Sequence, residues 1–162
     1  HIEGYVLGRS VTVEMCKEEM LKAIWVTYRS DLEGLGKNTS DVGWGCMIRV
    51  GQMQLAQMLG IHKQSIHPFE KKSEDWDIIH SFHDNDANSN YGINKILNGP
   101  IAVRHGAMEG KWMYIPQIAN ILTELHNTKP LKGYEGLRLI VQDGGIYYSE
   151  LASAMGYEVC IH

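Results

Sequence analysis

The sequence predicts an α+β fold that is rich in helices. Apolar residues recur with helical spacing over residues 14–35 and 46–59, shorter helical patterns follow near residues 76 and 116, and strand patterns appear only towards the carboxyl end. A period of 3.6 residues marks one face of a helix, whereas alternation marks a strand. With 162 residues and 44% hydrophobic content, the chain can bury one core and is expected to form a single domain.

The first predicted helix covers residues 14–35. Its apolar stripe, at i, i+3, i+4, i+7 and i+11, consists of Leu21, Ile24, Trp25, Tyr28 and Leu32. Gly34 and Gly36 would end this helix, because glycine commonly closes helices.

The second predicted helix covers residues 46–59 and follows a glycine turn at 43–45. The residues that give it an apolar surface are Met47, Ile48, Val50, Met53, Leu55, Met58 and Leu59. They spread over more than one side, so this helix is expected to be buried on most of its surface.

Shorter elements complete the chain. Ser73 predicts the N-cap of a third helix, which would carry Trp76, Ile79, Phe82 and His83. Residues 84–90 form a loop by composition, and Pro116 would open a fourth helix, because proline is tolerated at a first helical position.

The carboxyl end predicts the strands. Residues 137–143 are the best candidate, and a glycine pair and a short helix around residues 151–155 would follow. Residues 156–162 alternate like a further strand with no turn after it, and the chain begins at His1 rather than Met. We therefore expect a piece of a longer protein.

Composition excludes several classes. The formal charge is −4 and no run of Lys or Arg could follow a phosphate backbone, so nucleic acid is not an expected partner. Cys16, Cys46 and Cys160 are odd in number and irregularly spaced, which argues against a disulfide framework and favours the cytoplasm. No apolar stretch reaches the roughly twenty residues that a membrane helix needs, and no signal peptide is apparent.

Cys46 lies where a glycine turn meets the predicted start of a helix. Unpaired N–H groups at a helix N-terminus favour a thiolate, which is the nucleophilic form of cysteine. Gly43 and Gly45 would let a substrate chain approach closely, and Trp44 could wall the space beside the sulfur. A lone cysteine is usually a small buried hydrophobe, and we assign that role to Cys16 and Cys160. The turn favours the nucleophile for Cys46.

The stretch "SDVGWGCMIRVGQMQLAQ" at 40–57 resembles the active-site signature of the autophagins, a family of papain-like cysteine proteases. The segments "YVLGR" (5–9) and "WVTYR" (25–29) are similar to the amino-terminal part of that family, and "EGKW" (109–112) matches more loosely. The resemblance implies a papain-like fold, with residues 1–162 forming an incomplete protease domain truncated at the carboxyl end.

The resemblance also implies a function and site residues. Autophagins cut after the carboxyl-terminal glycine of a ubiquitin-like autophagy modifier, both to process its precursor and to release it from phosphatidylethanolamine. Cys46 matches the nucleophile, and Tyr28 matches a tyrosine that helps to hold the oxyanion. From periodicity alone, Tyr28 would be a core aromatic. Trp112 corresponds to a tryptophan that covers the glycine tail of the substrate, although its spacing to the next proline departs from the family pattern.

The sequence lacks the motif that supplies the general base in this family. Autophagins take it from an Asp-Pro-His segment downstream of the cysteine, and no Asp-x-His triplet occurs in these 162 residues. We therefore expect the β-rich part with His and Asp to lie outside this chain, which would be inactive by itself. His80, His83, His105 and His126 are expected to be surface or helix residues. His80 and His83 have helical ligand spacing but no third ligand, so neither a metal nor another cofactor is expected.

Two alternatives stay open beside the protease. One is a binding module or pseudo-protease fragment that grips a ubiquitin-like partner without cutting it. The other is a helical structural protein whose glycine turn is merely tight. If Cys46 is a reactive thiolate, its oxidation is a further hypothesis.

Overall fold

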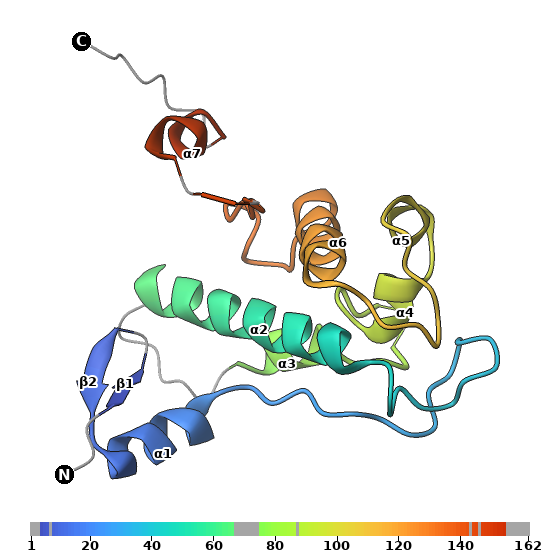
Figure 1. Ribbon diagram of the computed structural model, residues 1–162, viewed down its shortest axis with the longest axis horizontal. Helices are drawn as coiled ribbons and strands as arrows, with labels where there is room; N and C mark the ends of the chain where they lie inside the picture. Colours follow the sequence, from blue (N-terminus) through green and yellow to red (C-terminus); the bar gives the residue numbers. More distant parts are fainter. Residues whose placement is uncertain are drawn as a thin grey trace.

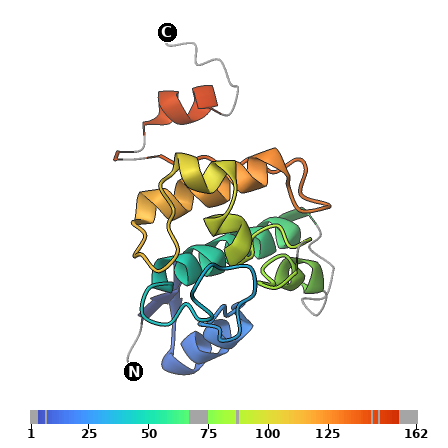
Figure 2. The same cartoon turned by 90° about the vertical axis from the view of Figure 1, so that its right-hand side faces the viewer.

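The computed structural model describes residues 4–6, 8–66, 75–86, 88–142, 144–145 and 147–154 and is mainly helical. Figure 1 shows α2 (Cys46–Ile66) as the long central helix, with α1 (Val13–Lys22) on one side and α6 (Ile115–Thr128) on the other. Figure 2 shows the same order after a turn of 90°. The helix that carries the candidate nucleophile is therefore the middle layer.

A small hairpin precedes α1. Strands β1 (Gly4–Val6) and β2 (Arg9–Val11) pair antiparallel, with Gly4 opposite Val11 and Val6 opposite Arg9. Gly8 supplies the positive φ of 77° that the tight connection needs. This is the only sheet among the described residues, so the expectation that strands occur only towards the carboxyl end is wrong.

Helix α1 ends much earlier than the periodicity of residues 14–35 predicts. Thr12 caps its start by accepting a hydrogen bond from the Met15 N–H, and the helix stops at Lys22, followed by extended backbone at Ala23. Beyond that point the run Ile24–Tyr28 is rich in β-branched and aromatic residues, which are poor helix formers. The predicted stripe is not one buried face, because Leu21 is 84% exposed and Leu32 only 5%.

Helix α2 confirms the second predicted helix and continues seven residues further, to Ile66. Its most buried side is the row Ile48, Gln52, Leu55, Ala56 and Leu59. The apolar residues of that row belong to one core cluster with residues of α3 (Trp76–His80), α4 (Ile93–Leu97) and α6. Met47 and Val50 face a different, partly open side, so α2 is not buried evenly all round.

The short helices around α2 shape its surroundings. Helix α3 stops at His80, so Phe82 and His83 follow it rather than continue it, and Ser73 lies outside the described residues. The predicted loop after it is confirmed at its described positions. Two helices that the sequence analysis does not predict follow, α4 and α5 (Pro100–Arg104).

Helix α6 lies directly on α2. It begins at Ile115 with Pro116 in its first turn, as predicted. A Cβ placed on Gly51 of α2 would lie 2.6 Å from Ile118 and 3.0 Å from Leu122 of α6. The missing side chain at Gly51 thus allows the two helices to approach closely.

The predicted strand at 137–143 does not form a strand among its described residues, 137–142. The side chain of Asn127 on α6 instead bonds both backbone groups of Leu139, accepting from its N–H at 3.0 Å and donating to its carbonyl at 2.8 Å. An amide side chain thus takes the place of a partner strand. Helix α7 (Tyr148–Ala154) stands apart from the helical body (Figure 1), and residues 155–162 lie outside the described part.

Candidate active site around Cys46

Cys46 is the first residue of α2, as predicted, and its side chain is half-buried. The backbone N–H of Arg49 bonds the carbonyl of Gly45 at 3.1 Å, which closes the first helical turn around the cysteine. The first turn contains no acidic residue. A negative charge on the sulfur would therefore meet the positive end of the helix dipole without a competing carboxylate in that turn.

The turn before Cys46 is built on Asp41. Its carbonyl accepts from the N–H groups of Gly45 at 2.8 Å and Trp44 at 3.3 Å. A Cβ on Gly45 would lie 2.5 Å from the Asp41 carboxylate, so no side chain fits there. Gly43 has a positive φ of 89°, a conformation that glycine adopts without strain.

A buried ionic cluster supports this turn from below. Arg49 is 3% exposed and binds Asp41 at 2.6 Å and Asp84 at 2.9 Å, while Asp41 and Asp84 are 0% and 6% exposed. Arg49 also donates to Gln52 at 3.0 Å, and Gln52 donates to the Tyr91 carbonyl at 2.7 Å. Removing one partner of such a pair leaves an uncompensated buried charge and costs about 3–5 kcal/mol.

No motif in the sequence predicts this cluster. One sequence feature could have indicated it. Arg49 lies inside the apolar pattern of the second predicted helix, and a buried charge needs a partner of opposite charge.

The polar chain continues to α6. The Tyr91 hydroxyl donates to Nδ1 of His126 at 2.7 Å, and Nε2 of His126 donates to the Leu137 carbonyl at 3.0 Å, which assigns the neutral Nε2–H tautomer. Burial lowers the pKa of His126 and raises the pKa of Tyr91 to about 12. Both groups are uncharged at neutral pH and act as structural links.

Tyr28 lies outside any helix and is 47% exposed, so the alternative of a core aromatic is wrong. Its neighbour Arg29 is tied to the turn before Cys46. The Arg29 N–H donates to Asp41 at 2.7 Å, and the Ser40 hydroxyl donates to the Arg29 carbonyl at 2.8 Å. The structure therefore connects the segment of Tyr28 directly to that of Cys46.

Trp112 reaches the same turn from 69 residues away. Its indole N–H donates to the Gly43 carbonyl at 2.9 Å, and the ring is 67% exposed. Trp44 has the opposite environment, because it is 7% exposed, belongs to the core, and donates to the Ser40 carbonyl at 3.0 Å. One tryptophan thus contacts the turn from outside and the other supports it from within.

Glu109 anchors the segment that carries Trp112. Its carboxylate accepts from the backbone N–H groups of Gly36 at 2.6 Å, Lys37 at 3.1 Å and Asn38 at 2.8 Å. The hydrogen bonds from Asn38 and then from Gly36 lower the pKa of Glu109, because they stabilise the ionised form. The loosely matching segment 109–112 is therefore fixed at both ends, one end on residues 36–38 and the other on Gly43.

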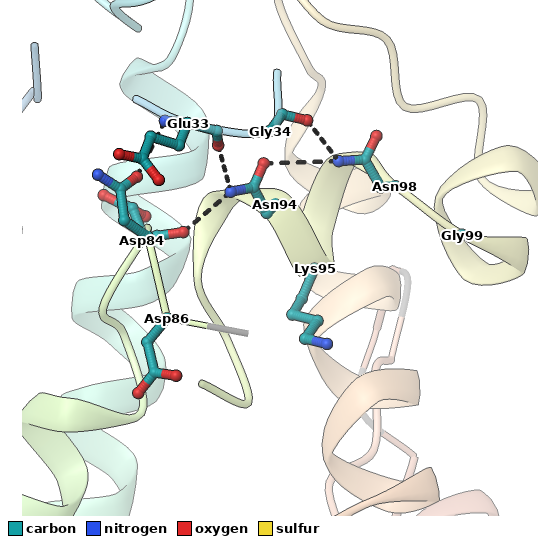
Figure 3. Close-up of a pocket in the computed structure, with 9 residues that line it drawn as sticks. Glu33, Gly34, Asp84, Asp86, Asn94, Lys95, Asn98 and Gly99 are labelled. Carbon is teal, nitrogen blue, oxygen red and sulfur yellow. Dashed lines mark hydrogen bonds between the residues drawn. The ribbon is translucent and has the colours of Figure 1, made fainter. Parts of the chain in front are cut away.

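Two cavities flank this region. An apolar groove of about 300 Å³ runs between α2 and α6 and begins at Met47, next to Cys46. The other, of about 520 Å³, is lined mainly by polar and charged residues and lies beside Asp84 (Figure 3). In it the Asn94 side chain donates to the carbonyls of Glu33 and Asp84, and the Asn98 side chain donates to the Gly34 carbonyl. These bonds join the loop at 33–34 to α4.

The histidines occupy several environments. His80 and His83 are exposed, His105 is half-buried and lies 2.8 Å from Glu124, and His126 is a fully buried helix residue. Within the described part of the chain, no group of three or more His, Cys, Asp and Glu side chains could hold a metal ion. No described helix is long and apolar enough to cross a membrane.

Comparison with known proteins places the chain in a family. The family model of the peptidase C54 catalytic domain matches residues 13–159. The chain is 33% identical over 132 residues to cysteine protease ATG4B of Gallus gallus and 35% identical over 131 residues to that of Xenopus laevis. Each alignment covers 75% of this chain and 33% of the relative.

A shorter match, 44% identical over 63 residues, is to cysteine protease ATG4D of Xenopus laevis and covers 37% of this chain and 13% of the relative. The chain spans about a third of the length of the curated ATG4B relatives that it matches. The resemblance drawn from the sequence is confirmed, and the chain belongs to the peptidase C54 family.

Proposed function

We propose that this chain is the nucleophile-bearing part of a cysteine protease that cleaves after the carboxyl-terminal glycine of a ubiquitin-like autophagy modifier. Its proposed substrates are the modifier precursor and the conjugate with phosphatidylethanolamine, and its proposed location is the cytoplasm. The observation that carries the proposal is the half-buried Cys46 at the first residue of α2, in a chain whose family is that of peptidase C54.

The proposed chemistry is acyl transfer. The Cys46 thiolate attacks the carbonyl carbon of the glycine, the amine leaves with a proton, and water then hydrolyses the thioester. The Tyr28 hydroxyl and backbone N–H groups at the start of α2 would stabilise the oxyanion, a task for which one donor contributes about 3–4 kcal/mol in other enzymes. The links of Arg29 and Gly45 to Asp41 support this pairing.

Of the three residues proposed for substrate binding, Gly45 and Trp112 would contact the substrate, and the buried Trp44 would act from behind the turn. The glycine turn leaves room for a backbone to pass, and the exposed ring of Trp112, fixed on the Gly43 carbonyl, would cover a glycine tail. Trp44 would support the turn from the core. A substrate without side chains at its end suits a channel formed by a turn and a flat ring.

The proton acceptor is proposed to come from sequence beyond these 162 residues. The chain has no Asp-x-His triplet. The buried His126 is already bonded through both ring nitrogens, and His105 is paired with Glu124. A thiol without a base should turn over slowly, so we expect the chain alone to bind and to react once rather than to cleave repeatedly.

The same observation supports a second candidate, a binding module that grips the modifier without cutting it. The two candidates differ at Cys46, since binding alone does not need a sulfur atom. Retained binding after Cys46→Ser, with no covalent product from the unmodified chain and no cleavage when downstream sequence is supplied, would favour the binding module.

The decisive experiment uses a ubiquitin-like autophagy modifier whose terminal glycine carries a vinyl sulfone. The 162-residue chain should form a covalent adduct at Cys46. Cys46→Ser should abolish the adduct, whereas Cys16→Ser, the matched control at the other described cysteine, should leave it unchanged. Equal modification of Cys16 and Cys46 would contradict the proposed function.

A further inference from the structure

Asp41 makes hydrogen bonds in three directions from a fully buried position. One carboxylate oxygen accepts from the Arg29 N–H at 2.7 Å, and the other accepts from Nε of Arg49 at 2.6 Å. Its backbone carbonyl accepts from the N–H groups of Gly45 and Trp44. The side chain is 0% exposed, and its bond to Arg49 is buried whereas its bond from the Arg29 N–H is partly buried.

Two of these bonds, those from Arg29 and from Gly45, each involve a residue next to a proposed catalytic residue. Arg29 follows Tyr28, and Gly45 precedes Cys46. The Ser40 hydroxyl adds a bond to the Arg29 carbonyl, so both backbone groups of Arg29 are held by residues 40 and 41. Arg29, the residue next to Tyr28, is therefore fixed to the turn through both of its backbone groups.

We propose that Asp41 is a positioning residue that holds the Tyr28 hydroxyl in register with the Cys46 sulfur. This inference rests on the proposed function, because it assumes that the two groups act on one carbonyl. An oxyanion donor works only when it lies about 2.7–3.1 Å from the developing charge, and a displacement of about 1 Å can cost roughly a hundredfold in rate. Asp41 would act through this geometry without touching the substrate.

The surroundings of Asp41 are built to keep it in place. Gly45 leaves the space that the carboxylate occupies, since a Cβ there would lie 2.5 Å from it. Arg49 neutralises its charge and is itself held by Asp84 and Gln52. The carboxylate thus offers one oxygen to each partner, Oδ1 to the Arg29 N–H and Oδ2 to Nε of Arg49.

Asp84 is the matched control that the protein offers. It is also buried and also bound to Arg49, but its other hydrogen bond is from the Ile93 N–H at 2.8 Å, towards α4. Its link to Arg29 is an ion pair of 3.6 Å with the half-exposed guanidinium, not a bond to the backbone. Loss of either carboxylate disturbs Arg49, but only loss of Asp41 removes the hydrogen bond that ties the Arg29 N–H to the turn.

The test compares Asp41→Ala and Asp84→Ala in the full 162-residue chain, with Asp41→Asn as a milder variant if alanine prevents folding. The first measurement is amide hydrogen exchange of Arg29 and Gly45. A buried hydrogen bond to a charged group corresponds to roughly tenfold or more in an opening equilibrium. We expect the Arg29 amide to exchange about tenfold faster after Asp41→Ala, and to change by less than about threefold after Asp84→Ala.

The second measurement separates oxyanion geometry from thiol access. A peptide aldehyde that ends in glycinal adds Cys46 to its carbonyl and needs a donor for the resulting oxygen, whereas iodoacetamide alkylates the sulfur without one. We expect Asp41→Ala to weaken glycinal binding about tenfold or more. The iodoacetamide rate at Cys46 should stay within about threefold of the rate in Asp84→Ala, and Asp41→Asn should recover part of the glycinal affinity.

Two outcomes would overturn the inference: unchanged exchange at Arg29 in folded Asp41→Ala, or equal losses of glycinal affinity in the two alanine variants. An unmodified chain that does not bind the glycinal peptide would instead contradict the proposed function. In that case the rate of amide hydrogen exchange at Arg29 still decides whether Asp41 ties Arg29 to the turn.

Discussion

The indole N–H of Trp112 donates a hydrogen bond of 2.9 Å to the carbonyl of Gly43, three residues before Cys46. Gly43 lies in the best match to the family signature, whereas Trp112 lies in the weakest. Glu109 fixes the same segment on residues 36–38. A loosely matching segment is thus held by two separate contacts, one on the turn before Cys46 and one on residues 36–38, and each can be tested by itself.

Trp112→Phe should cost about 0.5–1.5 kcal/mol of unfolding free energy, because it removes one hydrogen bond but keeps the aromatic ring. Trp76→Phe is the control, since Trp76 is 64% exposed and its indole donates to no described residue. Its cost should stay below about 0.5 kcal/mol. Urea denaturation measures both, and equal losses would show that the bond to Gly43 contributes nothing.

Gly45→Ala should destabilise the protein by about 1–3 kcal/mol, because the new Cβ would meet Asp41 at 2.5–2.6 Å and force a shift. The glycinal peptide should also bind more weakly, since the shift displaces the turn. Gly136→Ala has nothing within 4 Å of its Cβ and should change stability by less than about 1 kcal/mol. A silent Gly45→Ala in thermal unfolding would show that the turn tolerates a side chain.

Two glycines of α2 should respond in opposite directions. Gly51→Ala would place a Cβ 2.6 Å from Ile118 and should cost about 1–3 kcal/mol through overpacking against α6. Gly60→Ala meets nothing within 4 Å and should stabilise the helix by about 0.5–1 kcal/mol. Chemical denaturation of the two variants checks the pair, and stabilisation by both would contradict the close helix packing.

His126 should make the stability of the protein fall as the pH drops below about 6.5. Burial lowers its pKa below the ordinary value of 6.5, so the unfolded chain binds more protons in this range and stability falls as the pH decreases. His126→Gln should be less stable at pH 7.5 but should lose less between pH 7.5 and 5.5. Melting experiments at several pH values measure both quantities, with His83→Gln, at an exposed histidine, as the matched substitution.

Glu109 should contribute in a more acidic range. Its pKa is lowered from the ordinary 4.5 by the bonds from Asn38 and Gly36, so its contribution is complete above pH 4.5 and is lost as the pH falls through the lowered pKa. The difference in melting temperature between the unmodified chain and Glu109→Gln should therefore be largest above pH 5 and shrink towards pH 3. A difference that stays constant would exclude the carboxylate as its source.

Local patterns in the sequence were sufficient for α2, for the start of α6 and for the place of Cys46. Each prediction depends on a periodic apolar run next to a glycine or proline. Both features can be read from residues that are close together in the sequence. The same reasoning was wrong for residues 23–35, because a matching period does not outweigh a run of β-branched and aromatic residues. It also treated residues 137–142 as a strand, although Asn127 of α6 rather than a neighbouring strand bonds Leu139.

The support of the site could not be predicted in the same way. Arg49 and Asp84 are 35 residues apart, as are Tyr91 and His126, and Trp112 is 69 residues from Gly43. No local pattern links such partners, since each pairing depends on how α3, α4 and α6 pack on α2. The hairpin at 4–11 was missed for a simpler reason, because Gly8 is a turn signal that the sequence analysis did not use.

The 35-residue separation of Arg49 and Asp84 also bears on how the chain is made. At about 5–20 residues per second, Asp84 leaves the ribosome roughly two to seven seconds after Arg49. During that interval Arg49 has only Asp41 as an ion-pair partner, and the buried ionic cluster that supports the turn before Cys46 is incomplete. Cys46 is therefore synthesised before the residues that complete its native surroundings, which emerge only later in translation.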